Sequence, residues 1–139
     1  MPDERTILAF DYGTKRVGVA IGNVLISTAR PLEIIQTQER VKRFARIEEL
    51  IVHWQPDTLV VGLPVTEMGG EQLASRQARR FAHQLEGRYG LPVVLVDERG
   101  SSMAAQEIVG NAPDDAVAAA IILQRYFDAL PRQEQGRSP

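Results

Sequence analysis

The chain has 139 residues, no cysteine and a net charge of −2 at pH 7. This length fits a single globular domain, and the lack of cysteine excludes disulfides and thiolate metal sites. No apolar run approaches the roughly 20 residues that span a bilayer, and the polar start of the chain lacks the apolar core of a secretion signal, so we expect a cytoplasmic protein.

The first half of the chain is predicted to form three antiparallel strands. Residues 6–11 are an apolar run, and residues 16–22 alternate branched apolar residues with small ones. The short turn between them, which holds Gly13 and Thr14, predicts a hairpin. A weaker third strand is expected over residues 31–35, and the three strands would form a meander.

Helices and strands are predicted to alternate in the second half. Apolar residues spaced by three and four indicate helices, whereas short, wholly apolar runs indicate strands buried on both faces. In chain order we expect a helix over 38–54, a strand over 58–61, a helix over 71–89, a strand over 92–96, a short helix over 102–109 and a final helix over 114–130. The first of these helices is expected to bury Val41 and to expose Arg43.

This order of elements predicts an α/β three-layer sandwich. Three strands joined by tight turns and two strands each reached through a helix give a five-stranded mixed sheet, with an antiparallel meander, two parallel strands and helices on both faces. We expect one domain over 1–139, with its core over about 6–130 and a polar tail over 131–139.

Acidic residues stand at three places that this topology brings to one edge of the sheet. Asp11 ends the first strand, and Asp97 and Glu98 end the last. Asp114 and Asp115 open the final helix. The carboxyl ends of parallel strands share a rim, where open α/β sheets place their sites. Clustered carboxylates repel, so such a group either titrates at high pH or holds a hard cation such as Mg²⁺ or Mn²⁺.

Each of these positions also has a purely structural explanation. Asp114 follows a proline and suits a helix N-cap, and Asp115 in the first turn suits the helix dipole. Asp97 and Glu98 are adjacent in a strand and should point to opposite faces of the sheet. Only one of that pair is therefore expected to join Asp11.

The remaining polar residues indicate no further site. His53 and His83 lie on predicted helices without a second ligand at metal-binding spacing, so we expect packing or surface roles. Arg76, Arg79 and Arg80 fall on the outer face of their helix. Solvation is the simplest explanation for that face, and contact with nucleic acid is the alternative.

Four short motifs in a fixed order carry a family resemblance. They are Asp11-Tyr-Gly-Thr-Lys-Arg-Val-Gly, Val61-Gly-Leu-Pro, Val96-Asp-Glu-Arg and Asp115-Ala-Val-Ala-Ala-Ala. Together they resemble the YqgF, or RuvX, family, whose members are described as Holliday junction resolvases and pre-16S rRNA nucleases. The resemblance covers nearly the whole chain and implies the ribonuclease H-like fold, in agreement with the sandwich predicted above.

The resemblance also implies an activity and a site. It implies a nuclease that matures the 5′ end of 16S ribosomal RNA, with Mg²⁺ or Mn²⁺ as cofactor in a two-ion mechanism. By match to the family motifs, Asp11, Glu98 and Asp115 would be the catalytic residues and the metal ligands. The residues matched to positioning of the scissile phosphate are Gly13, Thr14, Lys15, Arg16 and Arg99. The expected partners are pre-ribosomal RNA, or branched DNA, and the ribosome or its precursor; we expect no membrane partner and a monomer or weak homodimer.

Three features leave other functions open. The segment before the last helix is short and lacks the Lys- and Arg-rich stretch usual in the family, which favours a non-catalytic nucleic-acid-binding module of ribosome assembly. Related enzymes often carry a fourth carboxylate where this chain reads Gly62-Leu63-Pro64. The Asp-x-Gly-Thr turn also occurs in phosphotransferases of the actin and sugar-kinase type, but those enzymes need two such domains and this length supplies one.

Overall fold

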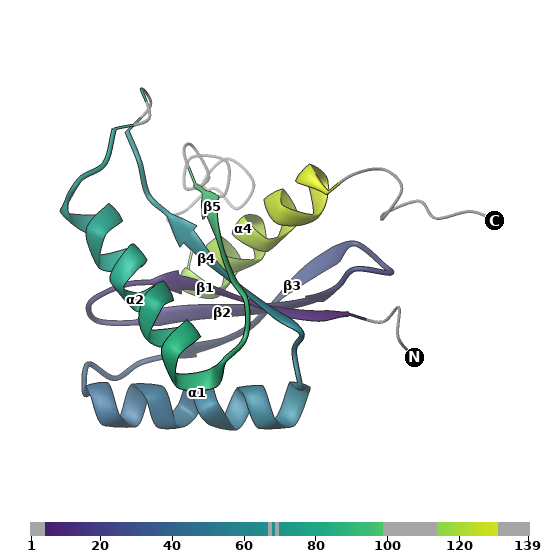
Figure 1. The fold of residues 1–139 in the computed structure, drawn as a ribbon, viewed down its shortest axis with the longest axis horizontal. Coiled ribbons are helices and arrows are strands. Elements are labelled where there is room, and N and C mark those ends of the chain that lie inside the picture. The colour runs from purple at the N-terminus through teal and green to yellow at the C-terminus, as the bar shows by residue number, and fades with distance from the viewer. Residues whose placement is uncertain (1–4, 67, 69, 99–113, 131–139) are drawn as a thin grey trace.

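The structure, a computed structural model, describes residues 5–66, 68, 70–98 and 114–130. Five strands form one mixed sheet, as the sequence predicted (Figure 1). They lie side by side in the order β3-β2-β1-β4-β5. Their bounds are β1 Thr6–Tyr12, β2 Val17–Asn23, β3 Thr28–Ile35, β4 Thr58–Leu63 and β5 Val93–Asp97.

Strand direction changes at β1, which is the central strand. It pairs with β2 in antiparallel register, and Asp11 lies opposite Gly18. It pairs with β4 in parallel register, and β4 in turn runs parallel to β5. The carboxyl ends of β1, β4 and β5 therefore share one rim of the sheet, as expected.

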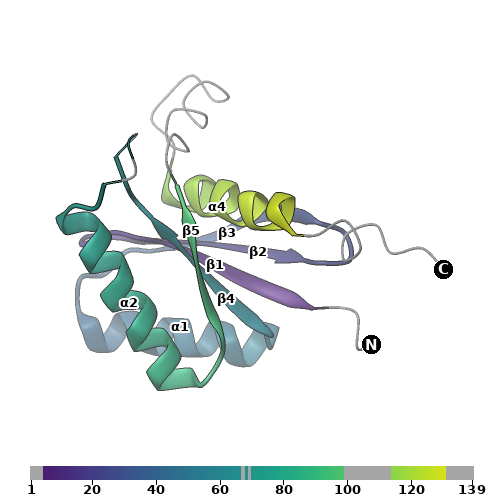
Figure 2. The same cartoon turned by 45° about the horizontal axis from the view of Figure 1, so that its top comes forward.

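Helices cover both faces of the sheet, which gives the three predicted layers (Figures 1 and 2). The helices α1 (Arg40–Trp54) and α2 (Leu73–Tyr89) pack on one face, and α4 (Asp115–Ala129) packs on the other. The first core is built around Phe10, Phe44 and Phe81, and the second around Ile122 and Phe127. The predicted short helix over 102–109 and the tail over 131–139 lie outside the described residues.

The expected faces of α1 are wrong at Val41, Arg43 and Ala45, the last of which is exposed although it was expected on the apolar face. Arg43 is buried, with 5% of its surface exposed, whereas Val41 is 82% exposed. The buried stripe runs through Arg43, Ile47 and Leu50, spaced by four and three residues. Val41 lies on the opposite stripe with Val52, which is also exposed. Arg43 tolerates burial because it donates hydrogen bonds to two backbone carbonyls.

The two helices on this face each end at a residue in the left-handed conformation. Gly90 follows α2 in the left-handed conformation, with φ of 68°, and its N–H donates to the Glu86 carbonyl at 2.9 Å. Gln55 ends α1 in the same way, with φ of 49°. No helix in the described part of the chain is long and apolar enough to cross a membrane.

Candidate active site

Asp11 reaches the α4 face of the sheet because of its place in β1. Side chains alternate between the two faces of a strand. Ile7 and Ala9 pack in the core under α4, so Asp11, two residues further, points to the same side. It stands at the carboxyl end of the central strand, where β1 turns back into β2.

Of the two acidic residues after β5, Glu98 joins this side. Val94 and Val96 pack against the core under α4, and Glu98 continues that alternation, whereas Asp97 is exposed. The Glu98 N–H donates to the Leu63 carbonyl at 3.1 Å, which extends the β4–β5 pairing by one residue. This hydrogen bond places the Glu98 backbone at the rim of the sheet, next to the end of β4.

The two aspartates that open α4 have different roles. Asp114 is the N-cap, and its carboxylate accepts a hydrogen bond from the Val117 N–H at 2.8 Å. Asp115 is the first residue of the helix and faces the turn after β1, where Arg16 Nε donates to its Oδ2 at 2.9 Å. The structural explanation therefore holds for Asp114, and Asp115 is the one that joins the cluster.

Removing the cap should affect stability without touching the ion pair. We expect Asp114→Ala to lower the free energy of unfolding by about 1 kcal/mol, because the Val117 N–H loses its acceptor. Asp114→Asn should retain most of the stability, since asparagine caps helices nearly as well. Urea denaturation of the two variants measures the difference. Equal stability of the alanine and asparagine variants would contradict the capping role.

Burial and mutual repulsion perturb the two inner carboxyl groups. Burial, and then the charge of Asp115, raises the pKa of Asp11 to about 7. Burial also raises the pKa of Glu98 to about 7; the charge of Asp11 adds to this effect and Arg125 opposes it. Each group feels the charge of a neighbour, so the three acidic residues form one electrostatic cluster. Near neutral pH Asp11 and Glu98 are therefore partly protonated, and a bound cation would favour their ionised forms.

Gly18 and Gly62, to which the sequence reasoning gave no role in the site, let α4 and Glu98 pack close to the strands on either side of β1. Gly18 pairs with Asp11 on β2, and a Cβ there would lie 1.8 Å from the carbonyl oxygen of Asp115. On β4, a Cβ at Gly62 would lie 3.0 Å from Oε2 of Glu98. Neither strand beside β1 therefore carries a side chain next to Asp11. Both glycines lie inside sequence motifs, but their purpose becomes visible only with the register of the sheet.

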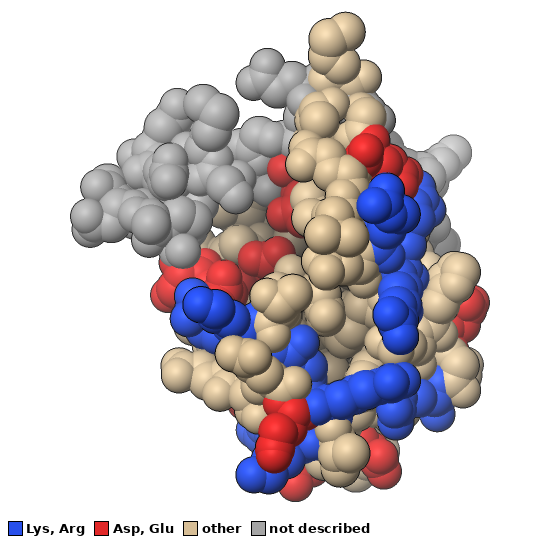
Figure 3. Space-filling model, turned by 90° about the vertical axis from the view of Figure 1, so that its left-hand side faces the viewer, with Lys and Arg blue, Asp and Glu red and all other residues tan. Residues whose placement is uncertain are grey.

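The turn from Gly13 to Arg16 forms one wall of the site. It is tight, because a Cβ at Gly13 would lie 2.6 Å from the Arg16 carbonyl oxygen. Thr14, Lys15 and Arg16 are exposed, and Lys and Arg side chains lie beside acidic ones on this end of the molecule (Figure 3). Arg16 forms an ion pair with Asp115. Arg99, the fifth residue matched to phosphate positioning, lies outside the described residues.

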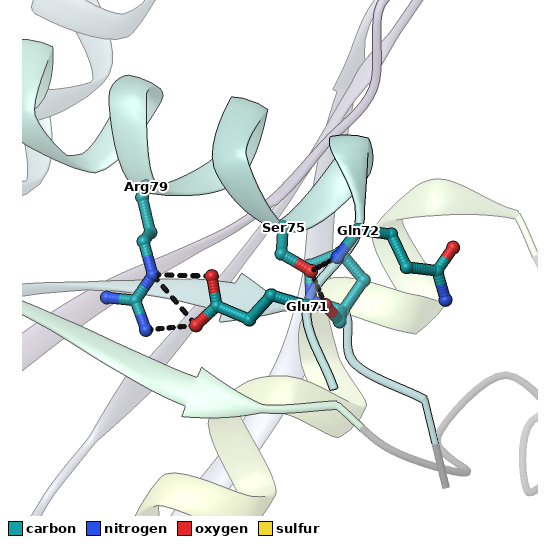
Figure 4. Close-up of polar contacts among 5 residues, drawn as sticks. Glu71, Gln72, Ser75 and Arg79 are labelled. Carbon is teal, nitrogen blue, oxygen red and sulfur yellow. Dashed lines mark hydrogen bonds and ion pairs between the residues drawn. The ribbon is translucent and has the colours of Figure 1, made fainter. Parts of the chain in front are cut away.

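The start of α2 is fixed to the end of β4 beside the site. Ser75 is fully buried; its hydroxyl donates to the Pro64 carbonyl and accepts from the Gln72 N–H at 2.9 Å (Figure 4). Arg79 pairs with Glu71 in the same view. The arginine face of α2 is exposed as predicted, but Arg79 is held by a carboxylate.

The carboxylates offer the right donors for a hard divalent cation, yet they are not arranged around one. Among residues 5–66, 68, 70–98 and 114–130, no group of three or more His, Asp or Glu side chains stands as a ready metal site. Asp11 and Glu98 supply half-buried oxygen donors, and Asp115 is turned to Arg16. The histidines lie elsewhere: His53 and His83 are both exposed on their helices.

Comparison with known proteins assigns the family. The model of a family described as "RuvX: Holliday junction resolvase" matches residues 5–129. A Bordetella petrii protein named "Putative pre-16S rRNA nuclease" is 64% identical over 132 residues, which cover 94% of this chain and all of that protein. A Ralstonia pickettii protein of the same name is 54% identical and covers 92% of this chain, with 90% of its own length matched.

Solved structures show that the fold is ribonuclease H-like. Thermus thermophilus RuvC in complex with a Holliday junction substrate matches 90% of this chain and 94% of its own, at 21% identity and a TM-score of 0.55. The fowlpox virus Holliday junction resolvase matches 90% of this chain and 99% of its own, at 14% identity and a TM-score of 0.56. The sheet order, the carboxylates at its rim and the family match over nearly the whole length agree: the chain belongs to the RuvX family.

Proposed function

We propose that the chain is a nuclease that uses a divalent cation to hydrolyse phosphodiester bonds in structured RNA. The observation that carries this proposal is the convergence of Asp11, Glu98 and Asp115 from β1, the end of β5 and the start of α4. Two of these carboxyl groups are half-buried and have a raised pKa, a costly arrangement that a hard cation would relieve.

Asp11, Glu98 and Asp115 would hold Mg²⁺ or Mn²⁺. When bound, such ions lower the pKa of an attacking water and stabilise the leaving oxygen. The chain itself supplies the frame: β1 and the β4–β5 pairing position Asp11 and Glu98, and Gly18 lets the first turn of α4, which carries Asp115, pack directly on β2.

Arg16 links the site to the phosphate it would bind. Its guanidinium now neutralises Asp115, and 55% of the Arg16 side chain is exposed. If Asp115 held a cation instead of Arg16, the Arg16 guanidinium would be available for a substrate phosphate. Lys15 and Thr14, exposed on the same turn, would contribute further contacts to the backbone of the nucleic acid.

The names of the relatives support pre-16S ribosomal RNA as the substrate. Relatives that match nearly the full length of the chain at 60% identity or more carry the name "Putative pre-16S rRNA nuclease". We propose 5′-end maturation of this RNA in the cytoplasm, on the ribosome or its precursor. Branched DNA is the second candidate, because the matching family model is described as a Holliday junction resolvase.

One cleavage assay tests the proposal. Purified protein is incubated with pre-16S RNA, an unrelated RNA of equal length and a four-way DNA junction, each with Mg²⁺ or with EDTA. We expect cleavage of the pre-16S RNA with Mg²⁺ only, and at least a thousandfold loss in Asp11→Asn, because the central ligand becomes neutral.

The control for Asp11→Asn is Glu86→Gln, which neutralises an exposed carboxylate near the end of α2. Its cleavage rate should match that of the wild type. Cleavage that persists in EDTA, or that survives Asp11→Asn, would contradict the proposed chemistry. Cleavage confined to the four-way junction would assign the second candidate substrate.

A further inference from the structure

A cationic pocket lies on the face of the sheet opposite the carboxylates. It has a volume of about 250 Å³ and opens between the start of α1, the middle of α2 and the end of β1. Three arginines and three glutamines line it, together with Tyr12, Thr14 and two phenylalanines; the six polar residues are Arg40, Arg43, Arg80, Gln38, Gln77 and Gln84. No acidic residue is among the lining residues.

The arginines of this pocket lack the carboxylate partners that other arginines on the same helices have. On α1, Arg46 pairs with Glu33 and Glu49, and on α2, Arg79 pairs with Glu71. Within the described residues, Arg40 and Arg80 form no ion pair, and neither does Arg43. The electrostatic attraction of three guanidinium groups is therefore left for an anion from outside.

Arg43 is the strongest sign that an anion belongs here. It is 95% buried, and its hydrogen bonds go to the neutral carbonyls of Thr37 and Thr14, each at 3.1 Å. Its guanidinium also lies 5.5 Å from the centre of the Tyr12 ring. A buried charge without a counter-charge is costly, and an anion in the pocket would compensate it.

The other groups in the pocket suit the rest of a nucleotide. Glutamine side chains offer both donors and acceptors, as the edges of bases and the hydroxyl groups of ribose require. Tyr12 offers an aromatic surface, packed 4.9 Å from the ring of Phe81. Figure 3 shows that Lys and Arg side chains continue across this end of the molecule, so a polyanion would be attracted along it.

The pocket and the carboxylates are separated only by the end of β1. Asp11 points to the α4 side, and Tyr12, the next residue, points to the side of α1 and α2. The turn from Gly13 to Arg16 connects the two sides, and Arg43 is hydrogen-bonded to that turn at Thr14. A strand of nucleic acid that crosses the turn would reach both places.

We propose that this pocket binds one nucleotide of the RNA substrate, with its phosphate held by Arg40, Arg43 and Arg80, while the scissile phosphate lies at the carboxylates. This inference rests on the proposed function for the identity of the anion. The arginines that bind the substrate would then belong to the helices α1 and α2.

The test measures binding without cleavage. The full-length protein in EDTA is titrated against a fluorescently labelled single-stranded RNA of about ten nucleotides, and anisotropy gives Kd at several salt concentrations. The double variant Arg40→Gln, Arg80→Gln should raise Kd about tenfold or more and flatten the slope of log Kd against log salt, since two phosphate contacts are lost. Both residues are exposed, so the fold should be kept.

The matched control is the double variant Arg46→Gln, Arg79→Gln, which removes the same charge from the same two helices but from paired positions. Its Kd should change by less than about threefold. Equal losses of RNA affinity in the two double variants would overturn the inference, because the loss would then follow from the change in net charge alone. Tighter binding of a free mononucleotide than of the RNA would overturn it as well.

The result of this binding experiment is independent of the result of the cleavage assay that tests the proposed function. Binding in EDTA that depends on Arg40 and Arg80 supports the pocket even if no cleavage is ever seen. Cleavage that needs Asp11, with a Kd for RNA that is unchanged in the Arg40→Gln, Arg80→Gln variant, would support the nuclease and refute the pocket.

Discussion

Asp11→Asn is expected to make the cation-free protein more stable at pH 8 than the wild type. Burial and the charge of Asp115 raise the pKa of Asp11 to about 7, so its ionised form is disfavoured in the folded protein. Asparagine removes that charge from the cluster. The gain should be on the order of 2 kcal/mol, or about 5 °C in the melting temperature.

The sign of the pH dependence follows from the same shift. The folded state keeps protons on Asp11 and Glu98 up to about pH 7, whereas the unfolded chain releases them near pH 4. Between these values the folded state binds more protons, so stability falls as pH rises. The advantage of Asp11→Asn should therefore be large at pH 8 and should disappear towards pH 4.

Thermal denaturation across this pH range, with EDTA or with Mg²⁺, measures the effect. Mg²⁺ should raise the melting temperature of the wild type at pH 8 and raise that of Asp11→Asn much less. Glu86→Gln, which neutralises an exposed carboxylate, should follow the wild type. A lower stability of Asp11→Asn at pH 8 without cation would mean that the Asp11 carboxylate is already well compensated in the fold.

Gly18→Ala is expected to be the most damaging single-methyl change in the site. Its Cβ would lie 1.8 Å from the Asp115 carbonyl oxygen and 2.8 Å from the Ala116 nitrogen. These are backbone atoms, so the start of α4 must move away from β2. We expect a loss of about 2–4 kcal/mol in the free energy of unfolding. Displacement of Asp115 by about 1 Å should also lower cleavage roughly a hundredfold.

Gly87→Ala is the matched control. Gly87 lies within α2, and a Cβ there meets nothing within 4 Å. Alanine should stabilise the helix by about 0.5–1 kcal/mol. Urea denaturation compares the two variants, and single-turnover cleavage by folded protein separates the loss of stability from the loss of geometry. Wild-type stability in Gly18→Ala would show that β2 and α4 are not in the close contact described.

The sequence predicted the fold well because the buried faces leave periodic signals. Apolar alternation and apolar stripes predicted the strands and the helices. The connections between them, tight turns in the first half of the chain and helices in the second, predicted the mixed strand directions and the helices on both faces. Carboxylates at strand ends then followed from the topology. The bounds shifted by only a few residues, as at β3, which begins at Thr28.

Other features depended on distant contacts and left no local signal. The run Val93–Val96 is apolar throughout, so the sequence does not show which of its residues face α4. Pairing with β4 sets those faces, and with them the side of the sheet to which Asp97 and Glu98 point. Arginine usually lies on the surface, so nothing in the sequence indicates that Arg43 is buried. Its burial depends on a hydrogen bond to the Thr14 carbonyl, which lies 29 residues away in the chain.

The consecutive placement of Asp11 and Tyr12 on opposite faces makes the length of β1 critical. In a strand, a shift of register by one residue moves every side chain to the other face. A one-residue insertion or deletion before Asp11 would point the tyrosine ring towards α4 and the carboxylate into the pocket lined by Arg40 and Arg80. The central strand should therefore tolerate a change of side chain at Ala9 more readily than a change in its number of residues.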